Sequence, residues 1–272
     1  MGDVILFPEL SELKNEVEKL RTELSMLVLE RDELLYVECK NIEMQYMLKL
    51  GALEYKVFES QCAMLRMKRK LELIQAKRNR QEKIVMEKIE ETLDDEFAQF
   101  QEQLKEQLGK MNEAIDRSHA QVLSDEETKE LKRLYRRVVK VLHPDLNPNI
   151  SEEKQQLFLR AVSAYENGDL NTLRIIDETI SDPQLAETKQ DAIASLRQER
   201  ERLTTLLDDI KERIVKIKSE YPYTVKEILQ DEQQVEQCRN QLENLLKQYK
   251  DSITYYKTKI QEIAGCNNGR SY

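Results

Sequence analysis

Residues 9–37 read ELSELKNEVEKLRTELSMLVLERDELLYV. Apolar side chains recur there at alternating spacings of three and four residues, at Leu10, Leu13, Val17, Leu20, Leu24, Leu27 and Leu34. Arg31 is the one polar residue at a position of this series. Such a repeat makes a narrow apolar stripe on a helix, and the stripe can be buried only against another helix. The stretch therefore predicts a coiled-coil arm.

Similar repeats run through the rest of the chain. A long helical stretch is expected from Gly51 to about residue 122, with a stripe at Ile89, Leu93, Phe97, Phe100, Leu104, Met111 and Ile115. The C-terminal third carries two further stripes, over 193–217 and 235–263. Pro222 separates them, because proline cannot continue a helix interior. Two matched stripes joined by a short break predict an antiparallel helical hairpin.

The composition agrees with long, surface-rich helices. Charged residues make up 35% of the 272 residues and apolar residues 40%, with only six glycines and five prolines. Ordinary domains have about 25% charged and about 45–50% apolar residues. So little Gly and Pro argues against a β-sandwich or a loop-rich α/β enzyme. We expect an all-α, elongated protein whose long antiparallel coiled-coil helices flank a small helical hairpin.

Charge and cysteine content limit the binding partners and the cell compartment that we expect for the protein. The net charge of −9 argues against a general attraction to nucleic acid or anionic lipid. No run of 18 apolar residues is present, so no membrane partner is expected. The four cysteines are scattered, without a CxxC motif, at Cys39, Cys62, Cys238 and Cys266. This usage predicts free thiols in a reducing compartment, and therefore a cytoplasmic protein.

Segment 124–180 differs in its pattern of residues from the rest of the chain. We expect coiled-coil arms at 1–123 and 181–264 and a flexible tail at 265–272. A capping box of Ser124 and Glu127 is expected to open the first helix of segment 124–180, at 125–142. This helix has an apolar side formed by Leu131, Leu134, Val138, Val141 and Leu142. The other side is basic, with Lys129, Lys132, Arg133, Arg136, Arg137 and Lys140, a local charge of +5 over 129–142. A second helix carries Leu157, Phe158, Ala161, Ala164 and Tyr165. The two apolar sides predict a hairpin that leaves the basic side in solvent.

The tip of this hairpin is His143-Pro144-Asp145. Pro144 disfavours helical backbone angles at His143, and Pro148 does the same at Asn147. We expect a short, rigid loop that displays an imidazole and a carboxylate beside the basic helix. Such a carboxylate can accept an arginine in a bidentate pair, while the basic helix steers toward an acidic surface.

These residues resemble a known family. LKRLYRRVVKVLHPDLNP (131–148), followed by FLRAVSAY (158–165), resembles helices II and III of the J domain of DnaJ-type co-chaperones. The resemblance implies docking on a DnaK-type heat-shock ATPase and stimulation of its ATP hydrolysis. The basic helix would meet an acidic surface of the ATPase, and the His-Pro-Asp loop would reach its interdomain linker. The implied partner-binding residues are Lys132, Arg133, Tyr135, Arg136, Arg137, His143, Pro144, Asp145 and Asn147.

The chain also departs from that family. The family's helix I is missing before Ser124, and Leu146 stands where the family has Lys or Arg. No Gly/Phe-rich linker or zinc-binding repeat follows, so the substrate-binding parts of a full DnaJ are absent from this stretch. We expect the long helix ending near Val122, or the helix after Asp182-Pro183, to pack in place of helix I.

Two other functions remain open at this point. The protein could be a structural coiled-coil scaffold whose hairpin does not stimulate an ATPase. A weaker alternative is nucleic-acid association through the basic run 66–80, which has seven cations against Glu72 alone but no aromatic residue to stack on a base. For that run a solvated coiled-coil face is the preferred interpretation.

We expect no enzyme activity in this chain, because the ATP chemistry would belong to the partner. No metal site is expected either, since no second ligand pair accompanies His119 in the sequence. We also expect no cofactor. The arms would hold an unknown client, and their stripes also allow a homodimer.

Overall fold

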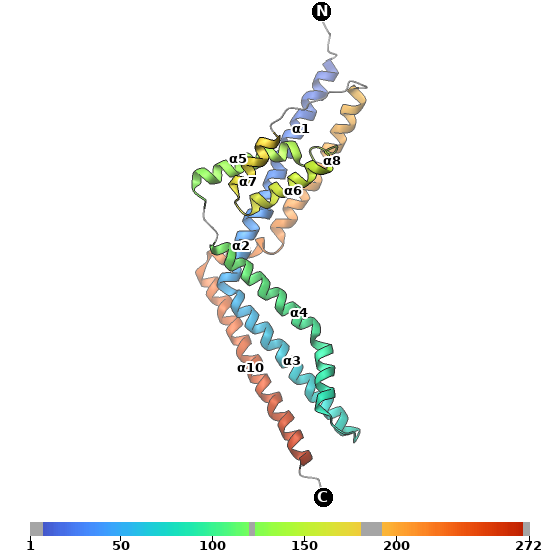
Figure 1. Ribbon diagram of the computed structural model, residues 1–272, viewed down its shortest axis with the longest axis vertical. Coiled ribbons are helices and arrows are strands. Elements are labelled where there is room, and N and C mark those ends of the chain that lie inside the picture. Colours follow the sequence, from blue (N-terminus) through green and yellow to red (C-terminus); the bar gives the residue numbers. More distant parts are fainter. Residues whose placement is uncertain (1–7, 120–122, 181–191, 269–272) are drawn as a thin grey trace, which may run out of the picture. The chain divides into compact units, whose positions relative to one another are not determined.

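The computed structural model describes residues 8–119, 123–180 and 192–268 (Figure 1). Every regular element in these ranges is a helix, so the predicted all-α class is confirmed. The described residues form two compact units, one within 1–41 and 121–224 and the other within 42–120 and 225–272. Each unit combines segments from both ends of the chain, which differs from the predicted division into N-terminal and C-terminal arms.

The first unit is built on two helices, α1 (Pro8–Asp32) and α8 (Ala192–Ser219), which lie side by side (Figure 1). The stripe predicted in 9–37 is buried in this pair, with Val17 and Leu24 packed in the same core as Leu203 and Ile210. After Asp32 the chain continues as a π-helical segment, Glu33–Glu38, and then as α2 (Cys39–Tyr46). The N-terminal stripe is therefore buried against another helix, as predicted.

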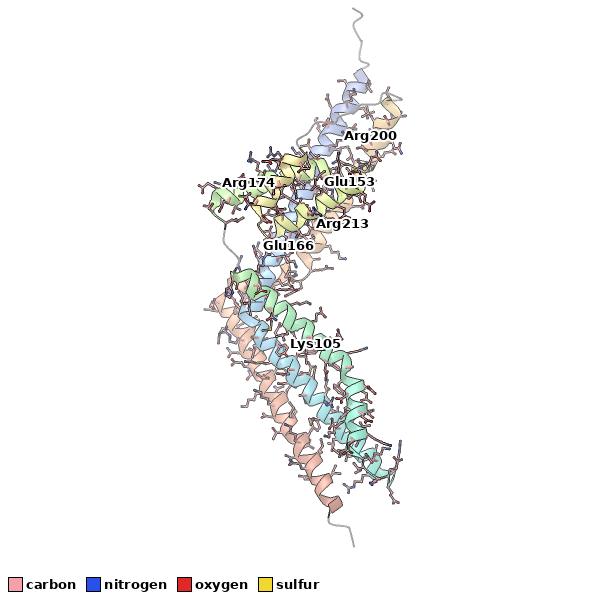
Figure 2. The ribbon with its side chains drawn as sticks, in the orientation of Figure 1. Lys105, Glu153, Glu166, Arg174, Arg200 and Arg213 are labelled. Atoms are coloured by element: carbon pink, nitrogen blue, oxygen red, sulfur yellow. The ribbon has the colours of Figure 1, made fainter. Side chains whose placement is uncertain are left out.

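The α1–α8 pair is parallel. Ion pairs join Glu16 to Arg200 at 3.4 Å, Glu23 to Lys211 at 2.9 Å and Glu30 to Lys218 at 2.9 Å; Arg200 is labelled in Figure 2. The residue numbers rise together on both helices, so the two helices run in the same direction. The prediction of antiparallel arms is wrong for this pair. An apolar stripe encodes burial against a helix but carries no information on that helix's direction.

The parallel register can be tested by exchanging charges. Glu23→Lys combined with Glu30→Lys places lysine opposite Lys211 and Lys218, and should lower the free energy of unfolding of this unit by about 1 kcal/mol. Adding Lys211→Glu and Lys218→Glu should restore it, as measured by urea unfolding at low salt. A fourfold variant no more stable than the double variant would contradict the parallel register.

The second unit packs α3 (Ala52–Asn79) between α4 (Met86–His119) and α10 (Glu232–Asn268) (Figure 1). The chain enters α3 through a second π-helical segment, Met47–Gly51, and enters α10 through a 3-10 turn, Tyr223–Val225, and α9 (Lys226–Gln230). Helix α4 is antiparallel to α3. Helix α10 is parallel to α3, since Lys49 donates to the Leu229 carbonyl at 2.9 Å while Ile74 packs near Ile260.

These pairings replace the predicted C-terminal hairpin: α8 pairs with α1, and α10 pairs with α3. Helix α10 also continues to Asn268, past the predicted start of the tail at 265, and residues 269–272 lie outside the described ranges. The long helix expected up to about 122 is interrupted after Asn79, where Gln81 adopts a left-handed conformation with φ of 56°. The sequence signal for this break is the polar run between Ile74 and Ile84, which offers no large apolar side chain for packing.

The basic run 66–80 contributes many of its charges to the second unit. Arg66 pairs with Asp94 at 2.7 Å and Arg69 with Glu96 at 2.9 Å, both on α4. Lys70 pairs with Glu90 and Lys77 with Glu82. These ion pairs favour the interpretation of the run as a solvated helix face.

None of the described helices is long and apolar enough to cross a membrane.

The hairpin segment of the first unit consists of α5 (Asp125–Leu142), α6 (Glu152–Glu166) and α7 (Leu170–Ile180). The predicted capping box forms: the Glu127 N–H donates to the Ser124 hydroxyl at 3.2 Å, and the Ser124 N–H donates to the Glu127 carboxylate at 2.8 Å. Ser151 caps α6 through its own hydroxyl, which accepts from the Lys154 N–H. The buried side of α5 differs slightly from the prediction, because Val141 is 43% exposed while Tyr135 is buried.

Candidate functional site

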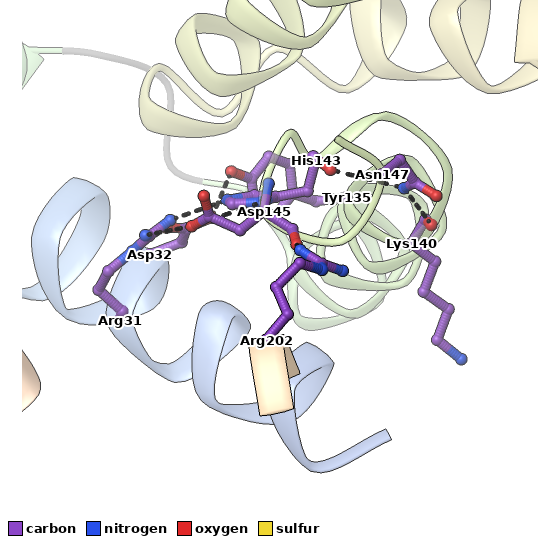
Figure 3. A network of polar contacts seen from close by, with 8 residues as sticks. All are labelled: Arg31, Asp32, Tyr135, Lys140, His143, Asp145, Asn147 and Arg202. Atoms are coloured by element: carbon purple, nitrogen blue, oxygen red, sulfur yellow. Dashed lines mark hydrogen bonds and ion pairs between the residues drawn. The ribbon is translucent and has the colours of Figure 1, made fainter. Parts of the chain in front are cut away.

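The loop after α5 is a tight turn, as its prolines predict. His143 ends the helix with an extended ψ of 126°, as a residue before proline prefers. The N–H groups of Leu146 and Asn147 donate to the His143 carbonyl at 3.1 and 2.9 Å. The Asn147 side chain donates to the Lys140 carbonyl at 3.0 Å (Figure 3). The turn therefore has a defined shape that its own backbone maintains.

The His143 imidazole is buried, at 3% exposure, so the expectation of a displayed imidazole is wrong. Its ring lies edge-on to Phe158, with centroids 5.0 Å apart. The Asp145 N–H donates to Nδ1 at 3.0 Å, and a guanidinium nitrogen of Arg31 lies 3.1 Å from Nε2. The ring is thus enclosed between α6 and α1.

This enclosure disfavours a proton on His143. Burial, and secondly the nearby Arg31 charge, lowers the pKa of His143, although Asp145 and Asp32 act in the opposite direction. The geometry gives the same result, because a proton on Nδ1 would remove the acceptor of the Asp145 N–H and would place a second positive charge beside Arg31.

Acid should therefore loosen the turn. A folded-state pKa below the unfolded value means that the unfolded chain binds the proton first, so this stabilisation is complete above about pH 6.5 and is lost as the pH falls. We expect the protection factors of the amides in residues 143–147, the ratio of intrinsic to observed exchange rates, to fall between about pH 7.5 and 5.5. His119→Gln, a control on exposed helix α4, should keep this pH dependence, whereas His143→Gln should remove it. Equal pH dependence in both variants would contradict the assignment to His143.

Asp145 is the part of the loop that solvent reaches, with 33% of its side chain exposed. Its carboxylate lies 3.8 Å from the Arg31 guanidinium, an ion pair without a hydrogen bond. Arg202 of α8 donates to the Asp145 carbonyl at 3.0 Å. Arginines from two different helices therefore converge on this one residue (Figure 3).

A buried network fixes α1 to the hairpin next to the loop. The Asp32 carboxylate is fully buried and accepts from Arg31 Nε at 2.9 Å and from the Tyr135 hydroxyl at 2.8 Å. Tyr135 stacks on Tyr165 with ring centroids 4.0 Å apart, and the Tyr165 hydroxyl donates to Glu33. Burial and the Asp32 carboxylate raise the pKa of Tyr135, which therefore stays protonated as a donor.

Tyr135 consequently does not take the place that the resemblance implied for it. It is 1% exposed, and α1 lies over it, so the prediction of a partner-facing tyrosine is wrong in this conformation. The physical reason is that Asp32 supplies a buried acceptor for its hydroxyl. The α5 sequence alone carries no sign of this acceptor.

The basic side of α5 is exposed as predicted, but part of it is paired. Lys132 pairs with Glu33 at 2.8 Å, and Arg137 pairs with Asp177 on α7. Arg133 and Arg136 are exposed, and neither forms an ion pair with a residue of the described ranges. Among the described residues, these two arginines are therefore the arginines of the predicted partner-binding set that have no ion-pair partner.

A groove of about 820 Å³ runs between α1, α5 and the loop. Ser25 and Leu29 of α1 line one side, Arg136 lines the other, and Leu146 of the loop closes one end. The Ser25 hydroxyl is buried and has no hydrogen-bond partner within the part of the chain that the structure describes. The interface between α1 and the hairpin is therefore incompletely packed along this groove.

The sequence did not single out Asp32 or Arg202, and no local pattern marks them. Arg31 did carry a signal, because it occupies an apolar position of the α1 stripe. Of the two helices predicted to replace helix I, the one after Asp182-Pro183 is α8, which contacts the loop through Arg202. The other, α4, belongs to the second unit, and α1 takes the remaining role.

No protein-family model matches the chain, and comparisons with curated proteins and with solved structures also found no match. The geometry defines a helical hairpin with a basic helix and a His-Pro-Asp turn, held against a parallel helix pair.

Proposed function

We propose that the hairpin at 124–180 acts as a J-domain-like module that docks on a DnaK-type heat-shock ATPase and stimulates its ATP hydrolysis. The observation that supports this most is the position of Asp145. Its carboxylate accepts no hydrogen bond from the described residues and stands at the end of the helix that carries the exposed cations Arg133 and Arg136. A carboxylate and a basic face so arranged suit a partner that offers an arginine beside an acidic surface.

Each group would have a separate task. Arg133 and Arg136 would steer the encounter with the acidic surface, and Asp145 would form the specific contact at the end of the approach. Pro144 and the turn hydrogen bonds to the His143 carbonyl would hold Asp145 in place. The chemical step would remain with the ATPase, and the two helical units would carry the client or complex to which it is recruited.

A structural scaffold is the second candidate. The burial of His143 and Tyr135 favours it, because two of the groups implied in docking are used inside the molecule. A scaffold would need the same helix contacts and no ATPase. The two candidates differ in one measurable property, the stimulation of ATP turnover by the intact chain.

The test is single-turnover ATP hydrolysis by a purified DnaK-type ATPase with and without the full chain. Stimulation that saturates with chain concentration would support the proposal. If neither the wild-type chain nor variants without the Arg31 or Arg202 contacts to the loop stimulate the ATPase, the scaffold remains as the function.

Charge reversal on α5 should weaken docking through its rate of association. Arg133→Glu with Arg136→Glu should slow association at low salt at least about tenfold and flatten its salt dependence, because these side chains act by steering. Lys154→Glu with Arg160→Glu, at two exposed sites on α6, changes the net charge equally, is the matched control and should change little. Equal losses of association rate in both variants would show that the partner responds to the net charge of the chain and not to the α5 face.

A further inference from the structure

The polar groups of the loop are already in use within the chain. Arg31 contacts His143 Nε2 at 3.1 Å and faces the Asp145 carboxylate at 3.8 Å. Arg202 donates to the Asp145 carbonyl at 3.0 Å. Arg31 is itself held by the buried Asp32 and is only 13% exposed, so its position is well defined.

This arrangement conflicts with docking at the same groups. A partner's arginine that approached Asp145 would meet the positive charge of Arg31 beside the carboxylate. A partner that approached Arg136 along the groove would meet α1 on the facing side. Tyr135 could not be reached at all while Asp32 covers it. The conformation described here and a fully docked conformation therefore exclude each other.

The contact also has the features of one that can release. The Arg31–Asp145 pair at 3.8 Å is longer than a hydrogen bond, so a partner's arginine in bidentate geometry would bind the carboxylate better. Beside this contact, α1 and α5 leave a groove of about 820 Å³, and the buried Ser25 hydroxyl at the groove has no hydrogen-bond partner among the described residues.

We propose that the α1–α8 pair is a latch on the turn formed by residues 143–147. Arg31 and Arg202 hold the turn in a closed state, and the DnaK-type partner docks only on the open state. This inference rests on the proposed function. It adds that docking is autoinhibited within the chain and that the apparent affinity equals the intrinsic affinity multiplied by the open fraction.

Two pairs of variants test the latch in the full chain. Arg31→Met removes the contacts with His143 and Asp145, and Arg202→Met removes the contact with the Asp145 carbonyl. Both changes keep a long, helix-compatible side chain. Lys14→Met on α1 and Arg200→Met on α8 are matched controls: Lys14 is exposed, Arg200 pairs with Glu16, and neither has a contact with the loop among the described residues. Arg202→Met leaves the buried Asp32–Arg31 pair intact, so it remains informative if Arg31→Met fails to fold.

Two quantities are measured for each variant: hydrogen exchange at residues 143–147 without partner, and the concentration that gives half-maximal ATPase stimulation. Removal of one such contact should enlarge the open fraction roughly fivefold. We therefore expect both latch variants to exchange faster at the loop and to stimulate at roughly fivefold lower concentration, with both controls unchanged.

The other outcomes overturn the latch, and they separate it from the proposed function. Loop exchange that does not change in the latch variants means that the arginines do not hold the turn closed. Faster exchange with weaker stimulation, in a chain whose wild type does stimulate, means that Arg31 and Arg202 position the loop for docking. Faster exchange with no stimulation by any form, wild type included, means that the proposed function itself fails.

Discussion

Asp145→Asn should abolish stimulation of a DnaK-type ATPase, with a loss of at least about thirtyfold, while the chain stays folded. Truncation of one partner in a desolvated, charge-assisted contact typically costs about 2–5 kcal/mol, and asparagine keeps the shape of the side chain but removes its charge. Stability should change little, because the carboxylate is one-third exposed and its nearest cation, Arg31, is 3.8 Å away.

The measurement is stimulated ATP turnover together with the thermal unfolding midpoint of the same preparation. Asp145 is a sharper site for this test than His143, which is buried against Phe158 and would lose packing as well as function. Stimulation that survives Asp145→Asn would show that the resemblance to J domains does not extend to the mechanism.

Asp32→Ala should have the largest effect on stability. The Asp32 carboxylate is fully buried and accepts hydrogen bonds from Arg31 and Tyr135. Its removal leaves a buried guanidinium and a buried hydroxyl without an acceptor, and breaking a buried pair in this way costs about 3–5 kcal/mol. Tyr135→Phe removes only one neutral donor of the same network and should cost about 1–2 kcal/mol.

Native-state hydrogen exchange of α5 is the suitable measurement, because the chain has two compact units and its global unfolding need not be two-state. The double variant should cost less than the sum of the two single variants, since both act on one network. A loss below about 1 kcal/mol for Asp32→Ala would mean that water reaches this carboxylate and that the network does not hold α1 to the hairpin.

In the α5 region, the features that the sequence predicted correctly are those with a local cause. The Ser124–Glu127 capping box, the end of the helix before Pro144 and the exposure of Arg133 and Arg136 are all as the sequence predicted. Each depends on residues within about one helical turn of one another, so a short stretch of sequence contains the whole cause. The prediction of Val141 as buried failed, because the width of a buried face depends on what packs against it.

The sequence by itself determined that the chain is helical, where several of its helices begin and end, and that a rigid His-Pro-Asp turn follows a basic helix. Only the tertiary structure decided that α1 and α8 run parallel, that His143 and Tyr135 are buried, and that Arg31 faces Asp145. Arg31 and His143 are 112 residues apart in the sequence. They meet only because the apolar side of α1 packs in the same core as the apolar side of α5. Periodicity states that a stripe must be buried, but the choice of partner and direction depends on the packing free energy of the assembled unit, which no local pattern contains.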